Sequence, residues 1–133
     1  MNILFYLLPK GKVEFLFDDF TIRQALEKME YHQYSTIPVI SREGKYLFSL
    51  SEGDLLWRIK ELNLNLEACE KQYIKDITPH KSVLAIRSNK NIDDLIDLIM
   101  NQNFVPVIDD RESFIGIITR KSVIEHLRKQ LSK

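Results

Sequence analysis

Two hydroxyl side chains, those of Ser51 and Thr119, stand where an apolar run of the sequence ends and a helical pattern begins. The free backbone N–H groups and the positive end of the dipole make such a helix start a favourable place for a phosphate. A carboxylate three residues later, such as that of Asp54, can accept hydrogen bonds from both hydroxyls of a ribose. Ser122 holds the equivalent position after Thr119 and does this poorly, because a hydroxyl accepts less than a carboxylate.

Each of these residues also has a purely structural explanation. Ser51 and Thr119 are good N-cap residues, and Asp54 can be the acid of a capping box. Arg120 and Lys121 can lie on a solvated helix face. Alternatively these two cations hold an anion, because positive charges at a helix N-terminus oppose the dipole unless a negative charge lies near them.

The composition limits the kinds of site that the chain offers. Nineteen basic and nineteen acidic residues cancel, so no net charge favours nucleic acid or an anionic membrane as a partner. Cys69 is the only cysteine, which excludes an intrachain disulfide and favours a reducing, cytoplasmic setting. The three histidines have no metal-binding spacing, so we expect no metal. Neither a nucleophile motif nor a phosphate loop is present, so we expect no enzymatic activity.

The pattern around these residues occurs twice. Residues 37–40, Ile-Pro-Val-Ile, return sixty-eight positions later at 105–108 as Val-Pro-Val-Ile, and the same offset relates Ser51 to Thr119. A fixed register over such a length indicates two copies of one supersecondary unit. We expect an α/β fold (α+β by some schemes) in which each copy runs strand, helix, strand, strand, helix. One copy cannot bury both faces of its sheet, so we expect the two βαββα repeats to pack about a pseudo-twofold axis, with two clefts between them.

Local signals place the elements. For the first copy they predict a strand at 13–17, a helix from the cap Thr21 to about residue 32, strands at 37–40 and 46–50 around a turn with Gly44, and a helix after Ser51. For the second copy they predict a strand at 83–86, a helix capped by Asn91, strands at 104–108 and 114–118, and a helix capped by Thr119.

The resulting division is a first repeat with its N-terminal segment at 1–62, a linker at 63–76 and a second repeat at 77–133. The linker carries a helical pattern of its own in Leu66, Cys69 and Tyr73. The apolar residues 3–8 are too few for a signal peptide or a membrane span. We expect them to pack on the core or at a dimer contact.

These residues resemble a tandem pair of cystathionine-β-synthase-type (CBS) domains, a Bateman module. The resemblance rests on the two x-Pro-Val-Ile strands and on the hydrophobic strands that lead into Ser/Thr-x-x-Asp, and it runs from about residue 13 to residue 131. It implies binding of adenosine-containing ligands, such as AMP, ADP, ATP, S-adenosylmethionine or cyclic dinucleotides, and dimerisation into a flat disc. Ser122 departs from the family pattern, which puts ordinary ribose recognition by the second copy in doubt.

Thr119 followed by Arg120 and Lys121 is similar to the pattern of small stand-alone CBS proteins of low-GC Gram-positive bacteria that bind cyclic di-AMP. In those proteins a Thr and two basic residues replace the ribose-binding acid. Family geometry adds a facing rim from the start of the first copy and from the approach to its proline strand. The resemblance implies these nucleotide-binding residues: Lys12, Val13, Tyr34, Ser35, Thr36, Ile37, Ser51, Asp54, Phe104, Val105, Thr119, Arg120, Lys121 and Ser122.

We therefore expect a non-enzymatic sensor without a cofactor, which binds an adenine nucleotide as its regulatory ligand in the cleft between the repeats. It would form a homodimer and signal in trans to an unknown effector protein. The alternative is a structural or protein-interaction module whose clefts hold no nucleotide. Phe48, where the second copy has Gly116, favours that alternative because a large side chain could crowd the first cleft.

Overall fold

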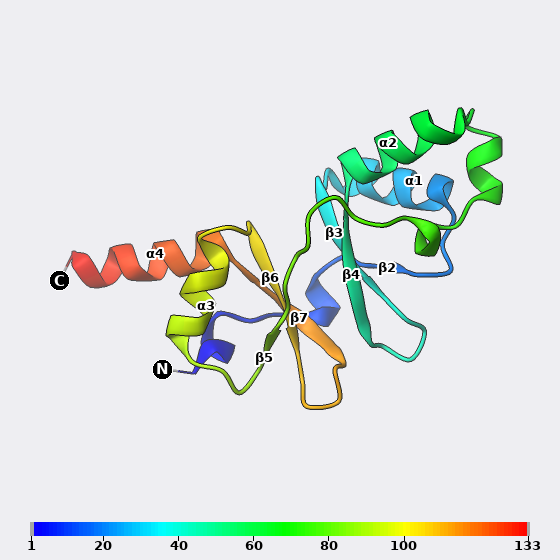
Figure 1. Ribbon diagram of the computed structural model, residues 1–133. Coiled ribbons are helices and arrows are strands. Elements are labelled where there is room, and N and C mark those ends of the chain that lie inside the picture. Colours follow the sequence, from blue (N-terminus) through cyan, green and yellow to red (C-terminus); the bar gives the residue numbers. More distant parts are fainter. Residues whose placement is uncertain (1, 133) are drawn as a thin grey trace. The chain divides into compact units, whose positions relative to one another are not determined.

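The computed structural model describes residues 2–132 and divides into two compact units. The first-repeat unit consists of Glu14–Ser82, and the second-repeat unit joins Met1–Val13 to Val83–Lys133. Both units contain a strand, a helix, two further strands and a helix in the same order (Figure 1). The predicted α/β class and the two βαββα repeats are confirmed.

The first-repeat unit is built on a three-stranded sheet of order β2-β3-β4. Its strands are β2 (Leu16–Phe17), β3 (Thr36–Ile40) and β4 (Tyr46–Ser51), and its helices are α1 (Ile22–His32), α2 (Glu52–Leu62) and the short 3-10 helices η3 (Ala68–Lys71) and η4 (Ile74–Asp76). The apolar faces of these elements meet in one buried core, which contains among others Leu16, Ile22, Ile37, Leu50, Leu55 and Ile74.

The second-repeat unit is built on a four-stranded sheet of order β1-β7-β6-β5. Its strands are β1 (Leu8–Pro9), β5 (Ile86–Arg87), β6 (Phe104–Ile108) and β7 (Phe114–Thr119), and its helices are α3 (Ile92–Ile99), α4 (Arg120–Leu131) and the 3-10 helices η1 (Ile3–Tyr6) and η2 (Lys10–Lys12). Its core contains among others Ile3, Ile86, Leu95, Val105, Ile118 and Val123.

The strand register is the same in the two repeats. Thr36 pairs with Ser51 across β3 and β4, and Phe104 pairs with Thr119 across β6 and β7. Both pairs of strands are irregular at the same point, one residue before the end of β3 and of β6. The sixty-eight-residue offset therefore describes backbone geometry as well as sequence.

The predicted helix starts are confirmed. In each of the four helices the N-cap side chain accepts a hydrogen bond from the backbone N–H three residues later, and the caps are Thr21, Ser51, Asn91 and Thr119. Gly44 has a φ of 90°, as its predicted turn requires. Within residues 2–132 no helix is long and apolar enough to cross a membrane.

Three predicted elements differ in extent. The strand expected at 13–17 shortens to the edge strand β2, because only Leu16 and Phe17 have a partner in β3. The strand expected at 83–86 is replaced by the edge strand β5, which shares only Ile86 with that range, because pairing with β6 is confined to Ile86 and Arg87. The linker, expected to carry a helical pattern, forms η3 and η4, which are held against the first-repeat core by the buried Cys69 and Ile74.

The N-terminal segment packs on a core, one of the two places expected for it. The division by sequence puts this segment with the first repeat, whereas in the structure it belongs to the second-repeat unit. Ile3 and Tyr6 are buried in the second-repeat core, and β1 pairs antiparallel with β7. Figure 1 shows this dark-blue end of the chain beside α3 and β7.

Candidate functional site

The turn between β7 and α4 begins with Thr119, the N-cap of α4. Its hydroxyl oxygen accepts a hydrogen bond of 3.1 Å from the Ser122 backbone N–H. The Ser122 hydroxyl in turn donates to the Thr119 carbonyl at 2.9 Å. The Thr119 hydroxyl therefore serves as a cap, and its own hydrogen remains available to a ligand because the cap bond uses only the oxygen.

Two cations open the first turn of α4. The Arg120 side chain donates from Nε to the Ile99 carbonyl at the end of α3, at 2.6 Å, and its backbone N–H donates to the Asn103 carbonyl at 2.9 Å. Only one guanidinium nitrogen is used in this way, so the terminal nitrogens can still donate to a phosphate. Lys121 is exposed, and no acidic residue lies in the first turn of α4.

Four further predicted residues share the unit with this turn. Phe104 is the strand partner of Thr119, and the buried Val105 is the partner of Ile118. Lys12 ends η2 and is exposed, and Val13 follows it as a buried residue. In β1, Leu8 pairs with Ile117 and Pro9 pairs with Gly116. The strand that leads to Lys12 therefore runs in the direction away from Thr119.

The equivalent turn of the first repeat has a fuller hydrogen-bond network. The Ser51 hydroxyl accepts from the Asp54 backbone N–H at 3.1 Å, and Asp54 Oδ2 accepts from the Ser51 N–H at 2.9 Å, which completes a capping box. Ser51 and Asp54 therefore have the helix-capping roles that the sequence offered as their structural explanation. Glu52 and Asp54 place two carboxylates in the first turn of α2, where α4 has two cations.

Asp54 has a second partner that the sequence motif does not contain. Its Oδ1 accepts from the His80 backbone N–H at 2.8 Å and lies 3.0 Å from the His80 ring nitrogen Nδ1. The side chain of Asp54 is only 4% exposed. Burial alone would raise the pKa of Asp54, but the hydrogen bonds from His80 and Ser51 outweigh it and hold that pKa below its usual value near 3.8.

The remaining predicted residues surround the start of β3. Thr36 is the strand partner of Ser51, Ile37 is buried beside Leu50, and the Ser35 carbonyl accepts from the Glu52 N–H at 2.9 Å. Tyr34 is 37% exposed, and its ring stacks on His32 with the ring centroids 6.1 Å apart. A partly exposed aromatic ring, stacked on His32, therefore lies two residues before Thr36.

The exchange of Phe48 for Gly116 has a structural cause. Phe48 packs against the first-repeat core, so it does not support the idea of a crowded cleft. Gly116 has a φ of 151° and faces Pro9 across the sheet, and a Cβ at this position would collide with the Leu8 carbonyl. The glycine is thus what lets β1 reach β7.

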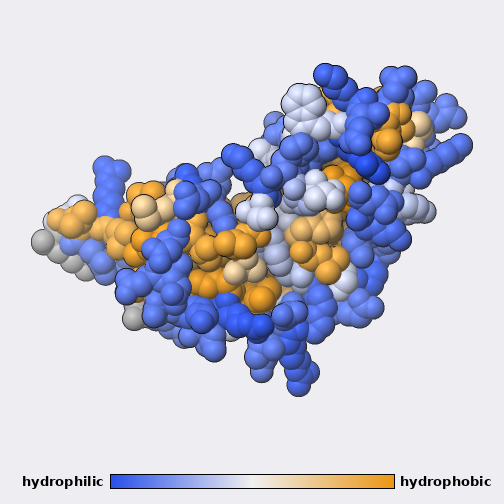
Figure 2. All heavy atoms as spheres, in the orientation of Figure 1, coloured by the Kyte–Doolittle hydropathy of each residue, from blue (hydrophilic) through white to orange (hydrophobic). Residues whose placement is uncertain are grey.

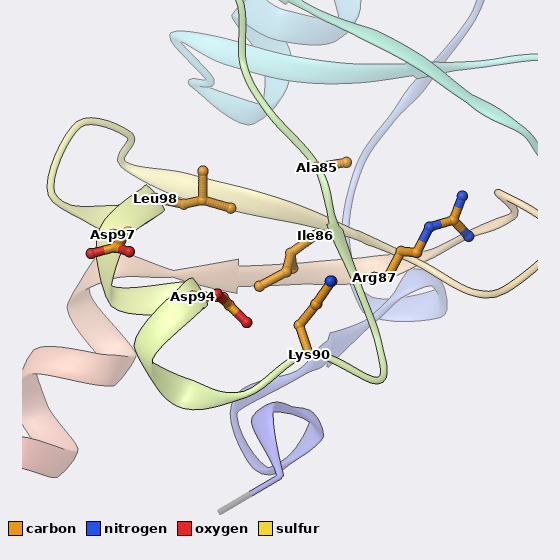
Figure 3. Close-up of a pocket in the computed structure, with 7 residues that line it drawn as sticks. All are labelled: Ala85, Ile86, Arg87, Lys90, Asp94, Asp97 and Leu98. Atoms are coloured by element: carbon orange, nitrogen blue, oxygen red, sulfur yellow. The ribbon is translucent and has the colours of Figure 1, made fainter.

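A shallow groove of about 410 Å³ lies in the second-repeat unit, between β5 and α3. It is lined by Ala85, Ile86, Arg87, Lys90, Asp94, Asp97 and Leu98. Figure 3 shows the side chains of Lys90 and Asp94 entering the space between the strand and the helix. The lining mixes both signs of charge and includes none of the predicted site residues. Among residues 2–132 no three His, Cys, Asp or Glu side chains gather as a metal site would require.

His80 is the residue that the sequence argument missed, because it lies twenty-six residues beyond Asp54 and outside any motif. The structure thus brings together two sets of predicted residues, one in each unit. Thr119, Arg120, Ser122 and Phe104 gather at the start of α4, and Ser51, Asp54 and Thr36 gather at the start of α2.

Comparison with known proteins gives matches along the whole chain. A family model described as CBS domain matches residues 8–61 and again residues 74–129. An uncharacterized protein of Methanocaldococcus jannaschii is 23% identical over 134 residues, which cover 92% of this chain and 48% of that protein. The chain thus spans about half the length of that relative.

Solved structures share the fold. The crystal structure of CbpB in complex with c-di-AMP matches with a TM-score of 0.90 and 24% identity, over 99% of this chain and 87% of that chain. The crystal structure of CBSX2 in complex with AMP matches with a TM-score of 0.76 and 23% identity, over 99% of this chain and 98% of that chain.

Proposed function

The chain belongs to the CBS domain family, and from that premise we propose that it is a regulatory module that binds an adenine nucleotide and catalyses no reaction. Two proteins with the same fold carry such ligands in their crystals, c-di-AMP in CbpB and AMP in CBSX2. The ligand would act by binding one conformation of the protein more tightly than another, with a coupling of about 1–3 kcal/mol to a partner protein.

The observation that carries this proposal is the unbalanced charge at the start of α4. Arg120 and Lys121 stand at the positive end of a twelve-residue helix, with no acidic residue in its first turn. Such cations are unfavourable there unless an anion joins them. A phosphate beside the Thr119 hydroxyl would meet the helix dipole and both cations together.

The residue at the third position of this helix selects between ligands. Ser122 already donates its hydroxyl to the Thr119 carbonyl and offers no carboxylate to a ribose diol. A cyclic dinucleotide depends less on such a carboxylate, because its 3′ hydroxyls are esterified and its two phosphates suit Arg120 and Lys121. We therefore propose cyclic di-AMP in preference to AMP, in line with the c-di-AMP bound to CbpB.

A second copy of the chain is the protein partner that the surface favours. Leu56 and Trp57 on α2 are 59% and 49% exposed, and Ile124 on α4 is 52% exposed. Figure 2 shows hydrophobic residues gathered over α3 and α4 on the face in view. Exposed apolar helix faces of this kind are typical of interfaces, so we propose a homodimer, which light scattering at micromolar concentration tests.

Thermal shift and calorimetry with cyclic di-AMP, AMP, ATP and S-adenosylmethionine test the function. At a hundredfold excess over its Kd, a bound ligand adds about 2.7 kcal/mol to the free energy of unfolding. The Arg120→Ala/Lys121→Ala double variant should lose this gain. Arg128→Ala/Lys129→Ala, which removes the same charge from the other end of α4, should keep it. If no nucleotide stabilises the parent, the structural or protein-interaction alternative replaces the proposal.

A further inference from the structure

The carboxylate of Asp54 is already occupied by the protein itself. Oδ2 accepts from the Ser51 N–H, and Oδ1 receives both the backbone N–H and the ring nitrogen of His80, at distances between 2.8 and 3.0 Å. A ribose diol needs acceptor sites on the same carboxylate, and three of its roughly four lone-pair directions are in use. With 4% of the side chain exposed, there is little surface through which a sugar could reach the remaining one.

The segment that carries His80 is fixed at its other end as well. The Ile74 N–H donates to the Phe20 carbonyl at 3.0 Å, and Ile77 is buried in the first-repeat core. Pro79 restricts the backbone immediately before His80. The chain from Ile74 to His80 is therefore attached to its unit at both ends, by a buried side chain and by the Asp54 carboxylate.

The second repeat lacks an equivalent acid. Ser122 occupies the position that corresponds to Asp54, and its hydroxyl bonds to Thr119 within its own turn. The buried acid and the donors that it holds are thus features of the first repeat. The two turns therefore differ in their side-chain bonds, although their strand pairing and helix caps correspond.

We propose that the hydrogen bonds from His80 to Asp54 close the first-repeat turn to a ribose and leave the Thr119 turn as the one nucleotide site of the chain. Asp54 then anchors residues 77–82 and does not bind ligand. That the chain binds one nucleotide rests on the proposed function. The anchor, meaning the hydrogen bonds between Asp54 and His80, does not depend on any ligand.

Amide hydrogen exchange of the free protein tests the anchor. The His80 N–H should exchange slowly in the parent and at least tenfold faster in Asp54→Ala. In the matched variant of the second repeat, Ser122→Ala, its rate should not change. If Asp54→Ala does not fold, Asp54→Asn takes its place: its single amide oxygen can accept from only one of the two backbone N–H groups, so the exchange of either Ser51 or His80 should become faster. A His80 amide that exchanges at the unprotected rate in the parent would overturn the anchor.

Calorimetry with cyclic di-AMP and AMP tests whether the first-repeat turn is closed to nucleotides. We expect no more than one nucleotide per chain and a Kd that changes less than threefold in Asp54→Ala. Two nucleotides per chain in the parent, or a tenfold loss of affinity in Asp54→Ala, would overturn it. Absence of binding by the parent would contradict the proposed function instead, and the exchange rates would still decide whether Asp54 holds His80.

Discussion

Pro9 lies directly opposite Gly116 in an antiparallel pair, so a strand from the beginning of the chain completes the sheet of its last repeat. This pairing depends on the absence of a side chain at 116, where φ is 151° and a Cβ would meet the Leu8 carbonyl. The buried Ile3 and Tyr6 secure the same segment to the second-repeat core. The sheet and the core of the second repeat therefore include residues that precede the first repeat.

Gly116→Ala should destabilise the protein by about 1–3 kcal/mol, the usual cost of forcing an extra methyl group into a packed site. The strained φ adds to the collision with the Leu8 carbonyl. Gly11→Ala is the matched control, because nothing lies within 4 Å of a Cβ at that position. Urea denaturation of both variants measures the change in the free energy of unfolding. Equal midpoints for the two variants would show that β1 is not held tightly against β7.

Asp54→Ala should lower the free energy of unfolding by about 1–3 kcal/mol, because it leaves the backbone N–H groups of Ser51 and His80 without their acceptor. Ser122→Ala removes only one hydroxyl, which bonds within its own turn, and should cost less. Chemical denaturation at pH 7 compares the two variants. A smaller effect for Asp54→Ala than for Ser122→Ala would contradict the described role of Asp54.

The same carboxylate should make stability depend on pH. Its pKa in the folded protein is lowered, so its contribution is present above the unfolded value of about 3.9 and is lost as the pH falls through the lower folded value. As the pH falls below about 4, the parent should therefore lose stability more steeply than Asp54→Asn. Asp19, whose pKa Arg42 also lowers, contributes equally to both proteins. Parallel curves from denaturation at several pH values would contradict the lowered pKa.

Lys121→Ala should affect the free and the liganded protein in opposite directions. Without nucleotide, removing this exposed cation from the helix N-terminus should stabilise the protein by about 0.3–1 kcal/mol. With cyclic di-AMP present, the gain in stability on binding should shrink. Lys129→Ala, at the favourable end of the same helix, should destabilise the free protein and leave the gain from ligand unchanged. Thermal melts with and without ligand separate the two effects.

The repeat explains why much of the fold could be predicted. Two copies of one pattern fix the same strands and helix caps twice, and Thr36–Ser51 and Phe104–Thr119 confirm that register. The path of the N-terminal segment could not be predicted in the same way, because Leu8 and Pro9 pair through their backbone and carry no periodic signal. Gly116 was the available clue, since a glycine that replaces a large residue often marks a close backbone approach.

The candidate site, too, could be predicted only in part from the sequence. The N-cap roles of Ser51 and Thr119 follow from short spacings, which the sequence displays. The partner of Asp54 lies twenty-six residues away and bonds mainly through its backbone N–H, which every residue except proline has. Only the fold of residues 77–82 against α2 shows that His80 holds this acid.

The most direct test of the account is a titration of the ¹⁵N-labelled protein with cyclic di-AMP, followed through its amide resonances. We predict that the largest changes in chemical shift belong to the amides of Arg120, Lys121 and Ser122, the first three residues of α4. The amides of residues 51–54, at the start of α2, should move little. Shifts centred on residues 51–54, or no shifts with any adenine nucleotide, would contradict binding at the Thr119 turn.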